Sequence, residues 1–339
     1  MNASNVFVSE LISEQPREGA QVLAGELSRH LQQVHHAITL SRKAGESGRT
    51  PAMVGRFVGR RALSFLRASN FERIVYMPSS GLTLGAIVRS VLIWWSSTRP
   101  PMDIVLTQVH ISDRLCRLLF RWRPKTWRLV VATRDQRRVL GSADDNDDVG
   151  LLSPRIPPSR IARLTKAAAR QRLQIDLDDR VYLHVGHATR RRNLTVLQGL
   201  TPPGQLFIVV SDAFDEEPNS LPRGASVRVL RGFQEDMGSI YAAADVYVFP
   251  TVDPAAVIGL PMSVFEALAN GVPVVALESA ALRRWSSLPG LYICRDEGEF
   301  VSAARAAQSG QVDFTPTAPQ IAECADDLSI CLAARMLAS

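Results

Sequence analysis

Apolar residues in the first half of the chain alternate between short continuous runs and segments with helical spacing. Runs at 5–9, 73–76, 103–107 and 128–132 are rich in apolar and β-branched residues and predict strands. Between them, apolar residues recur at intervals of three and four, which predicts amphipathic helices. Strands that alternate with helices predict a Rossmann-like, doubly wound parallel sheet. The helix expected from residue 20 has its apolar face at Val22, Leu23, Leu27, Leu31 and Val34.

The second half repeats this alternation, and its segment Gly259–Ala276 is the most informative in the chain. It predicts a tight turn, a short helix, a glycine stop and a buried strand. Pro261 suits the first turn of a helix, and Gly271 suits the position just after one. Glu266 follows one turn later, where a carboxylate suits a neutral diol such as a ribose. The N–H groups expected to be free to hold a diphosphate at the helix start are those of Met262, Ser263 and Val264.

Four segments of the second half together resemble one protein family. Their order and spacing are similar to those of the retaining glycosyltransferases of the GT-B fold, in the large family with a Glu-x7-Glu signature (glycosyl transferases group 1). The resemblance covers residues 180–310 well and the first half loosely. The four segments are Val181–His187 with Arg190–Leu194, Val227–Gln234, Ile240–Thr251 and Gly259–Ala276.

This resemblance implies an α/β chain of the GT-B class, with two Rossmann-like doubly wound domains facing a central cleft. Residues 1–172 would form the basic, acceptor-side domain. Residues 173–315 would form the domain that binds the nucleotide sugar. Residues 316–339 would form a C-terminal helix that crosses back to the first domain.

The resemblance also implies where the donor binds. Catalytic roles fall on Arg192, Glu266 and His110, the last of which follows a predicted strand. Arg192 would stabilise charge on the departing diphosphate, and Glu266 would accept hydrogen bonds from the ribose. The donor-binding positions are Gly19, Gly186, His187, Arg192, Gly232, Phe233, Gly259, Leu260, Met262, Ser263 and Glu266.

Several of these residues have a structural alternative that the sequence leaves open. The run Arg190–Arg192 can be wholly exposed, and Glu266 can pair with a nearby arginine. His110 can be a surface or packing residue, and Gly19 can be a simple turn residue. Asp245 is expected only to cap or orient a turn before its strand, and we leave it out of the site.

The chain also departs from the family pattern at the donor site. Ile258 stands where the first glutamate of the signature falls, and Asp253 is the nearest acid upstream. His187 stands at a phosphate-binding arginine and is charged only in part near neutral pH, whereas Arg192 replaces a lysine and keeps the charge. These departures favour a second hypothesis, a non-catalytic homologue that binds nucleotide or a partner enzyme. A sugar-nucleotide epimerase is disfavoured, because no further carboxylates cluster for acid–base chemistry.

The expected function is therefore that of a glycosyltransferase of the hexosyltransferase type. It would move a sugar from a nucleoside-diphosphate sugar, UDP- or GDP-linked, to a glycan or lipid-linked acceptor. The resemblance implies retention of configuration, and a place in surface polysaccharide or glycoconjugate biosynthesis. No metal or cofactor is expected, because protein cations can take the part of magnesium. The acidic run Asp144–Asp148 is expected to be a solvated loop.

Length and composition fit this expectation. A chain of 339 residues with 46% hydrophobic content favours two domains. Its four cysteines show neither metal-site spacing nor a disulfide framework, which is typical of a reducing compartment. The first residues lack a basic stretch followed by an apolar one, and residues 73–89 are too short and broken to span a bilayer. We therefore expect a cytoplasmic protein.

Charge is shared unevenly between the halves. Residues 1–172 contain 27 Lys and Arg against 13 Asp and Glu, whereas residues 173–339 contain 12 against 20. Basic segments at Arg56–Arg67 and Arg114–Arg128 alternate with apolar and aromatic residues, which suits an anionic membrane surface at the inner face of the cell membrane. An ordinary solvated helix face is an equally open interpretation. Nucleic acid is disfavoured as a partner, because no binding motif accompanies the charge.

Overall fold

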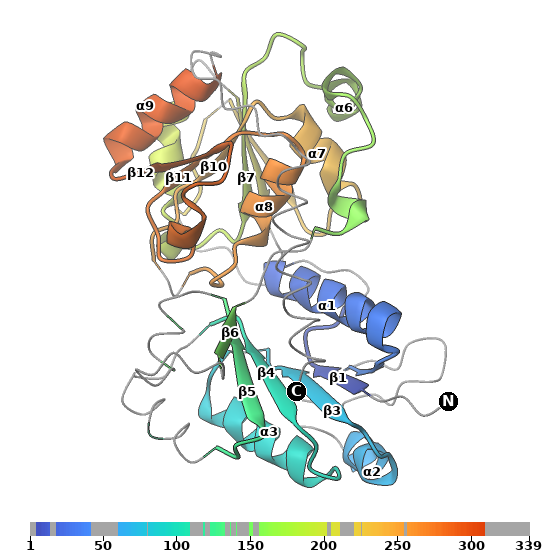
Figure 1. Cartoon of the computed structure of the whole chain (residues 1–339). Helices are drawn as coiled ribbons and strands as arrows, with labels where there is room; N and C mark the ends of the chain where they lie inside the picture. The colour runs from blue at the N-terminus through green and yellow to red at the C-terminus, as the bar shows by residue number, and fades with distance from the viewer. Residues whose placement is uncertain are drawn as a thin grey trace. The chain divides into compact units, whose positions relative to one another are not determined.

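The computed structural model divides the chain into two compact units. It describes residues 5–13, 18–41, 60–79, 81–108, 118, 123–132, 136, 140, 149–151, 156–201, 205–210, 220–224, 226–253 and 256–308. The first unit is built from residues 1–16 and 20–152, and the second from residues 17–19 and 153–339. Each unit contains one six-stranded sheet (Figure 1).

The first unit has an entirely parallel sheet in the order β2-β1-β3-β4-β5-β6. The first strand lies inside the sheet with later strands on both sides, which is the doubly wound arrangement that the alternating pattern predicts. The strands are β1 (Asn5–Ser9), β2 (Ile38–Leu40), β3 (Arg73–Met77), β4 (Met102–Leu106), β5 (Trp127–Val131) and β6 (Val149–Leu151). Its helices of six or more described residues are α1 (Gly19–His35), α2 (Arg60–Ala68) and α3 (Leu84–Trp95).

The second unit repeats this architecture in the order β12-β11-β10-β7-β8-β9, again with parallel pairing throughout. Its strands are β7 (Val181–Gly186), β8 (Gln205–Val210), β9 (Val227–Arg231), β10 (Val246–Phe249), β11 (Val274–Leu277) and β12 (Leu291–Cys294). Its α-helices are α6 (Lys166–Leu173), α7 (Met237–Ala243), α8 (Met262–Ala269) and α9 (Glu297–Gln308). Short 3₁₀ helices occupy Pro158–Arg160, Arg190–Arg192, Leu194–Leu200 and Arg283–Trp285.

The direction of winding reverses between β7 and β10, because the chain leaves β7 toward β8 and β9 and then returns to β7's other side. Ligands of open parallel sheets bind outside the carboxyl ends of strands at such a switch point. In this unit the switch point lies at the ends of β7 and β10, where Gly186 and Phe249 are the last strand residues. The candidate site is therefore sought there.

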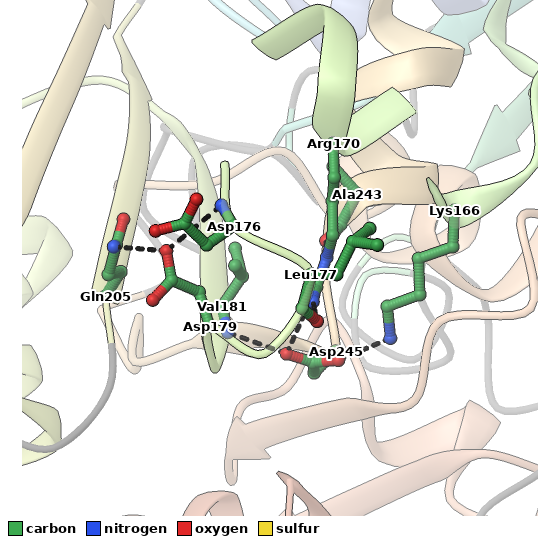
Figure 2. Close-up of polar contacts among 9 residues, drawn as sticks. All are labelled: Lys166, Arg170, Asp176, Leu177, Asp179, Val181, Gln205, Ala243 and Asp245. Atoms are coloured by element: carbon green, nitrogen blue, oxygen red, sulfur yellow. Dashed lines mark hydrogen bonds and ion pairs between the residues drawn. The ribbon is translucent and has the colours of Figure 1, made fainter. Parts of the chain in front are cut away.

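The division between the units falls at residue 152, twenty residues before the expected one at 172. The reason is the packing of α6 against α7 of the second unit (Figure 2). Arg170 of α6 is buried, and its guanidinium donates to the Ala243 carbonyl at 3.0 Å and to Asp245 Oδ2 at 2.9 Å. Asp245 also accepts the Val181 N–H at 2.7 Å, and it pairs with Lys166. As expected, Asp245 orients the start of a strand. It lies at the amino ends of the strands, opposite the switch point.

Two segments named in the sequence analysis lie outside the described residues. They are the C-terminal helix expected at 316–339 and the acidic run at 144–148. None of the helices among the described residues is long and apolar enough to cross a membrane.

Candidate functional site

The floor of the candidate site is the carboxyl end of β7, where His184 is fully buried. Its Nδ1 lies 2.9 Å from the carbonyl oxygen of Val248 in the neighbouring strand β10. A carbonyl can only accept, so Nδ1 carries the proton. Burial lowers the pKa of His184 to about 4, which keeps the ring neutral near pH 7. Nε2 is then a bare acceptor, and it has no hydrogen-bond partner among the described residues.

Gly186 ends β7 directly beside this ring. A Cβ at this position would lie 3.1 Å from His184 Nε2 and 3.5 Å from a terminal guanidinium nitrogen of Arg192. Such an approach is tighter than nine in ten real Cβ contacts, so a larger residue here would require the histidine ring to give way by a few tenths of an ångström. Two nitrogen-bearing side chains thus converge on the space that a glycine leaves open.

Arg192 is the buried member of the arginine run. Arg190 and Arg191 are exposed, whereas Arg192 is only 9% exposed. The Thr251 hydroxyl donates to the Arg192 carbonyl at 3.3 Å and ties the short helix to the loop after β10. Burial lowers the pKa of the Arg192 guanidinium, although an arginine stays charged near neutral pH. Its Nε has no hydrogen-bond partner in the part of the chain that the structure describes, so this cation retains a donor for a ligand.

His187, which stands where the resemblance implies a phosphate-binding arginine, differs from an arginine in its charge. Burial, followed by the charge of Arg192, lowers the pKa of His187 to about 4. The sequence predicted a partly charged imidazole, but a ring in this environment is neutral near pH 7. His187 can offer a hydrogen bond to a ligand, whereas Arg192 provides the positive charge.

Helix α8 begins next to the end of β7, as the turn at Gly259, Leu260 and Pro261 predicts. Pro261 is the residue before the helix, and Leu260 is fully buried. The Tyr247 hydroxyl fixes the first turn, since it lies 2.7 Å from Ser263 Oγ and 3.2 Å from the Val185 carbonyl. This hydroxyl therefore joins β10, β7 and the N-terminus of α8.

The first turn of α8 offers fewer N–H groups than the sequence predicted. The Val264 N–H donates to the Pro261 carbonyl at 3.0 Å. Met262 and Ser263 precede it, and their N–H groups belong to the unpaired first turn of the helix. Gly271 donates its N–H to Leu268 at 2.9 Å just past the helix end, which confirms the predicted glycine stop.

Glu266 lies inside the unit and is only 3% exposed. Its Oε2 accepts the Tyr241 hydroxyl at 2.8 Å and lies 3.9 Å from a guanidinium nitrogen of Arg160. Burial raises the pKa of Glu266, while Arg160 and the Tyr241 hydrogen bond oppose that rise. The structural alternative, pairing with an arginine, is thus present in the fold. Both of these contacts are made by Oε2, so they leave the role of Oε1 open.

The remaining expected positions are spread over several elements. Gly232 follows β9 with φ +80°, a conformation that favours glycine, and Phe233 comes next. Gly19 is the first residue of α1. His110 lies outside the described residues. Ile258 is half-buried, and Asp253 lies 3.8 Å from Arg191 across an ion pair.

The structure therefore brings together one group of the predicted residues, at the ends of β7 and β10. Gly186 and Arg192 are direct neighbours, and Ser263 is linked to them through Tyr247 and Val185. Sequence reasoning missed His184, Tyr241 and Tyr247, which hold this group in place. Each of these three residues is a polar ring within an otherwise apolar strand or helix. That pattern could have identified them from the sequence, because a buried tyrosine hydroxyl needs a partner.

Comparisons with known proteins bear on the fold and on the family. Residues 203–310 match the model of the family described as glycosyl transferases group 1. No curated protein matches the chain by sequence. Two solved structures share the fold over almost the whole length: HepE from Anabaena, in complex with UDP and glucose (14% identity, TM-score 0.70, 100% of each chain covered), and sucrose-phosphate synthase from Thermosynechococcus elongatus (15% identity, TM-score 0.67, 98% of this chain and 99% of that one).

A glycosyltransferase from Rickettsia africae is also similar, at 12% identity and a TM-score of 0.70, with 97% of this chain and 94% of that chain covered. These likenesses confirm the fold class, two Rossmann-like domains of the GT-B type. The family match and this fold together support a glycosyltransferase enzyme.

Substitution of Gly186 by alanine tests the close approach at the end of β7. The added Cβ would press on His184 Nε2, and overpacking of this kind typically costs about 1–3 kcal/mol. We expect Gly186→Ala to unfold at a lower guanidinium concentration. Gly25→Ala is the matched control, because a Cβ on α1 at that position meets nothing within 4 Å. It should stabilise the protein by about 0.5–1 kcal/mol. Equal behaviour of the two variants would contradict the packing described here.

The depressed pKa of His184 predicts a pH dependence of stability. The unfolded state binds a proton near pH 6.5, but the folded state does so only near pH 4, so stability is complete above pH 6.5 and is lost as the pH falls toward 4. Between pH 6.5 and pH 5 this ring should contribute a loss of about 2 kcal/mol. His184→Asn, which keeps a donor but cannot gain the proton, should remove this contribution. Denaturant unfolding of both proteins at pH 6.5 and at pH 5 measures the loss of stability. An equal loss in the variant and in the unmodified protein would refute the assignment.

Proposed function

We propose that the protein transfers a sugar from a nucleoside-diphosphate sugar to a glycan or lipid-linked acceptor. The observation that carries the proposal is the buried Arg192 guanidinium, which converges with His184 on the space above Gly186. A buried cation at the switch point of a parallel sheet, beside a helix N-terminus, suits a diphosphate.

In this proposal the second unit binds the donor. Arg192, His187 and the N–H groups of Met262 and Ser263 hold the diphosphate. The backbone at Gly232 and Phe233 lies beside the nucleobase, and Gly259 and Leu260 shape the turn before α8. The structures of HepE contain UDP with glucose in one case and UDP-glucose in another, which favours a UDP-linked donor here over the GDP-linked alternative.

Glu266 is proposed to bind the ribose through Oε1 while Oε2 stays on Tyr241. The buried hydrogen bond at 2.8 Å would then orient the carboxylate rather than compete with the ligand. Gly19, the first residue of α1, is proposed to line the donor site. His110 is proposed to act near the donor sugar on the strength of the resemblance alone.

The chemistry is the transfer of a glycosyl group. The bond between the anomeric carbon and a phosphate oxygen breaks, and its electron pair leaves with the nucleoside diphosphate. The acceptor hydroxyl oxygen bonds to the anomeric carbon and gives up its proton to the departing diphosphate. Arg192 and the amides of α8 are preorganised toward the charge that grows on the diphosphate, which lowers the barrier. Retention of configuration and independence of metal remain proposals that rest on the resemblance.

The proposed setting is surface polysaccharide or glycoconjugate biosynthesis, at the cytoplasmic face of the cell membrane. The basic balance of the first half supports an anionic acceptor or surface, because positive charge raises the local concentration of anions. A peripheral association with the membrane belongs to the same proposal.

A non-catalytic homologue that binds nucleotide is the second candidate function. The half-buried Ile258 favours it, because an alkyl side chain cannot hold sugar hydroxyls at the position of the first signature glutamate. Such a protein would bind the nucleoside diphosphate through the same residues but would not release it from a donor.

Substitution of Arg192 tests the donor site. Arg192→Ala should weaken UDP binding about tenfold or more, because hydrogen bonds to charged groups contribute about 1.5–3 kcal/mol. Arg191→Ala is the matched control, since that neighbouring side chain is exposed, and it should bind UDP nearly as the unmodified protein does. Titration calorimetry measures both. Equal loss in the two variants would point to nonspecific charge attraction, and no loss in either would remove Arg192 from the site.

A further inference from the structure

Helix α3 buries two polar residues and exposes a face of large apolar residues, whereas an ordinary surface helix exposes its polar side chains. Arg89 and Ser90 are buried, together with Ala86 and Ile93. Leu84 and Trp95 are 65% and 64% exposed. The exposed large apolar side chains of α3, which we name the α3 stripe, are Leu84, Val88, Val91, Leu92 and Trp95.

The α3 stripe forms one continuous face, because its members are separated by four, three, one and three residues. Ten large apolar side chains are exposed among the described residues, and five of them belong to this stripe. Singly scattered apolar side chains are normal on a surface, whereas a contiguous apolar patch marks an interaction site. Figure 1 shows α3 lying along the sheet of the first unit near β4 and β5.

Buried polar contacts fix the helix in this orientation. The Arg89 Nε donates to the Tyr76 hydroxyl at 2.9 Å and lies 3.1 Å from Glu10 Oε1. Glu10 Oε2 accepts the Ser79 N–H at 3.0 Å. A rotation that buried the α3 stripe would separate Arg89 from these partners and leave charges unpaired in the interior, which is strongly destabilising. The outward apolar face is therefore a stable feature of the fold.

The charge around the α3 stripe favours an anionic partner. Residues 73–102 contain no aspartate or glutamate. Of their three arginines, Arg73 pairs with the buried Asp103 and Arg89 is buried against Glu10. Arg99 is the one that remains beside the stripe to meet an anion. Arg99 follows the helix, and its guanidinium carbon lies 5.7 Å from the ring centroids of both Trp94 and Trp95. Tryptophan and arginine side by side at the end of an apolar face suit the boundary between lipid headgroups and hydrocarbon.

An apolar cavity of about 220 Å³ adjoins the α3 stripe and shares Val91 with it. Strands β4 and β5 contribute Ile104, Leu106 and Trp127 to its lining, and Arg123 and Ile87 also line it. Trp127 Nε1 is buried and has no hydrogen-bond partner within the described ranges. An apolar space with a cation and one unused donor suits the hydrocarbon chain of a lipid with an oxygen-rich head.

We propose that α3 docks the first unit on an anionic lipid surface. The stripe inserts into the boundary between headgroups and hydrocarbon, Arg99 lies among the phosphates, and the adjoining cavity receives a lipid chain. A helix of 12 residues is too short to cross a bilayer, so it lies in the plane of the surface. The inference rests on the proposed function in one respect, that a lipid-linked acceptor would be met at this surface.

Vesicle sedimentation of the full chain tests the proposal. The protein should sediment with phosphatidylglycerol vesicles at low salt and bind phosphatidylcholine vesicles more weakly. The double variant Leu84→Ser/Trp95→Ser should bind the anionic vesicles at least about tenfold more weakly, because two large apolar side chains no longer leave water. Arg99→Gln should weaken binding about fivefold and reduce its dependence on salt.

Leu177→Ser is the matched control, because Leu177 is 64% exposed but belongs to the second unit. It should bind vesicles as the unmodified protein does. Lipids with brominated chains should quench tryptophan emission in the bound protein, and Trp95→Phe should lose much of that quenching. Retained vesicle binding in the double variant would overturn the proposal. So would light scattering that shows a dimer of the unmodified protein and a monomer of the double variant.

Nucleotide binding, measured in parallel, separates this inference from the proposed function. The double variant should bind UDP as tightly as the unmodified protein, because α3 belongs to the first unit. Failure to sediment with intact UDP binding would contradict the lipid surface alone. Sedimentation without any nucleotide binding would contradict the transferase alone.

Discussion

The candidate site depends on the close approach of two polar side chains over a residue that has no side chain of its own. His184 Nε2 and the Arg192 guanidinium lie above Gly186, and a methyl group on that residue would press on the histidine at 3.1 Å. The Val248 carbonyl holds the histidine from the neighbouring strand, and Tyr247 holds the first turn of α8 against the same strand end. A buried cation is thus fixed beside a helix N-terminus before any ligand arrives, which is the preorganisation that catalysis by electrostatic stabilisation requires.

The two arginine-rich features of the chain have different physical roles. In the run 190–192, burial sets Arg192 apart from its exposed neighbours, and in the proposed function it is the cation that binds the diphosphate. In α3, burial of Arg89 against Glu10 and Tyr76 orients the helix and turns its apolar face to the outside. In both cases a buried charge specifies the geometry of its surroundings, although such a charge by itself contributes little net stability.

Local patterns in the sequence were enough to predict the strand–helix alternation of a doubly wound sheet, and the resemblance implied the GT-B class. Apolar runs gave the strands β3, β4 and β5 to within a residue or so, and Pro261 and Gly271 bounded α8 because their backbone constraints are local. The partners of buried polar groups could not be predicted in the same way. Glu266 meets Tyr241 and Arg160 only because α7, α8 and the 3₁₀ helix Pro158–Arg160 come together. The exposed apolar face of α3 likewise depends on Glu10, which lies 79 residues away from Arg89.

The central claim is that the end of β7 and the start of α8 bind the diphosphate of a sugar donor. Its most direct test is the thermal shift of the purified protein against UDP, GDP, ADP and their sugar conjugates, followed by donor hydrolysis on the best of them. The account predicts a clear shift with one nucleotide, UDP before the others, and slow release of its diphosphate from the sugar conjugate. A shift without release would favour the non-catalytic homologue, and no shift with any nucleotide would contradict the site itself.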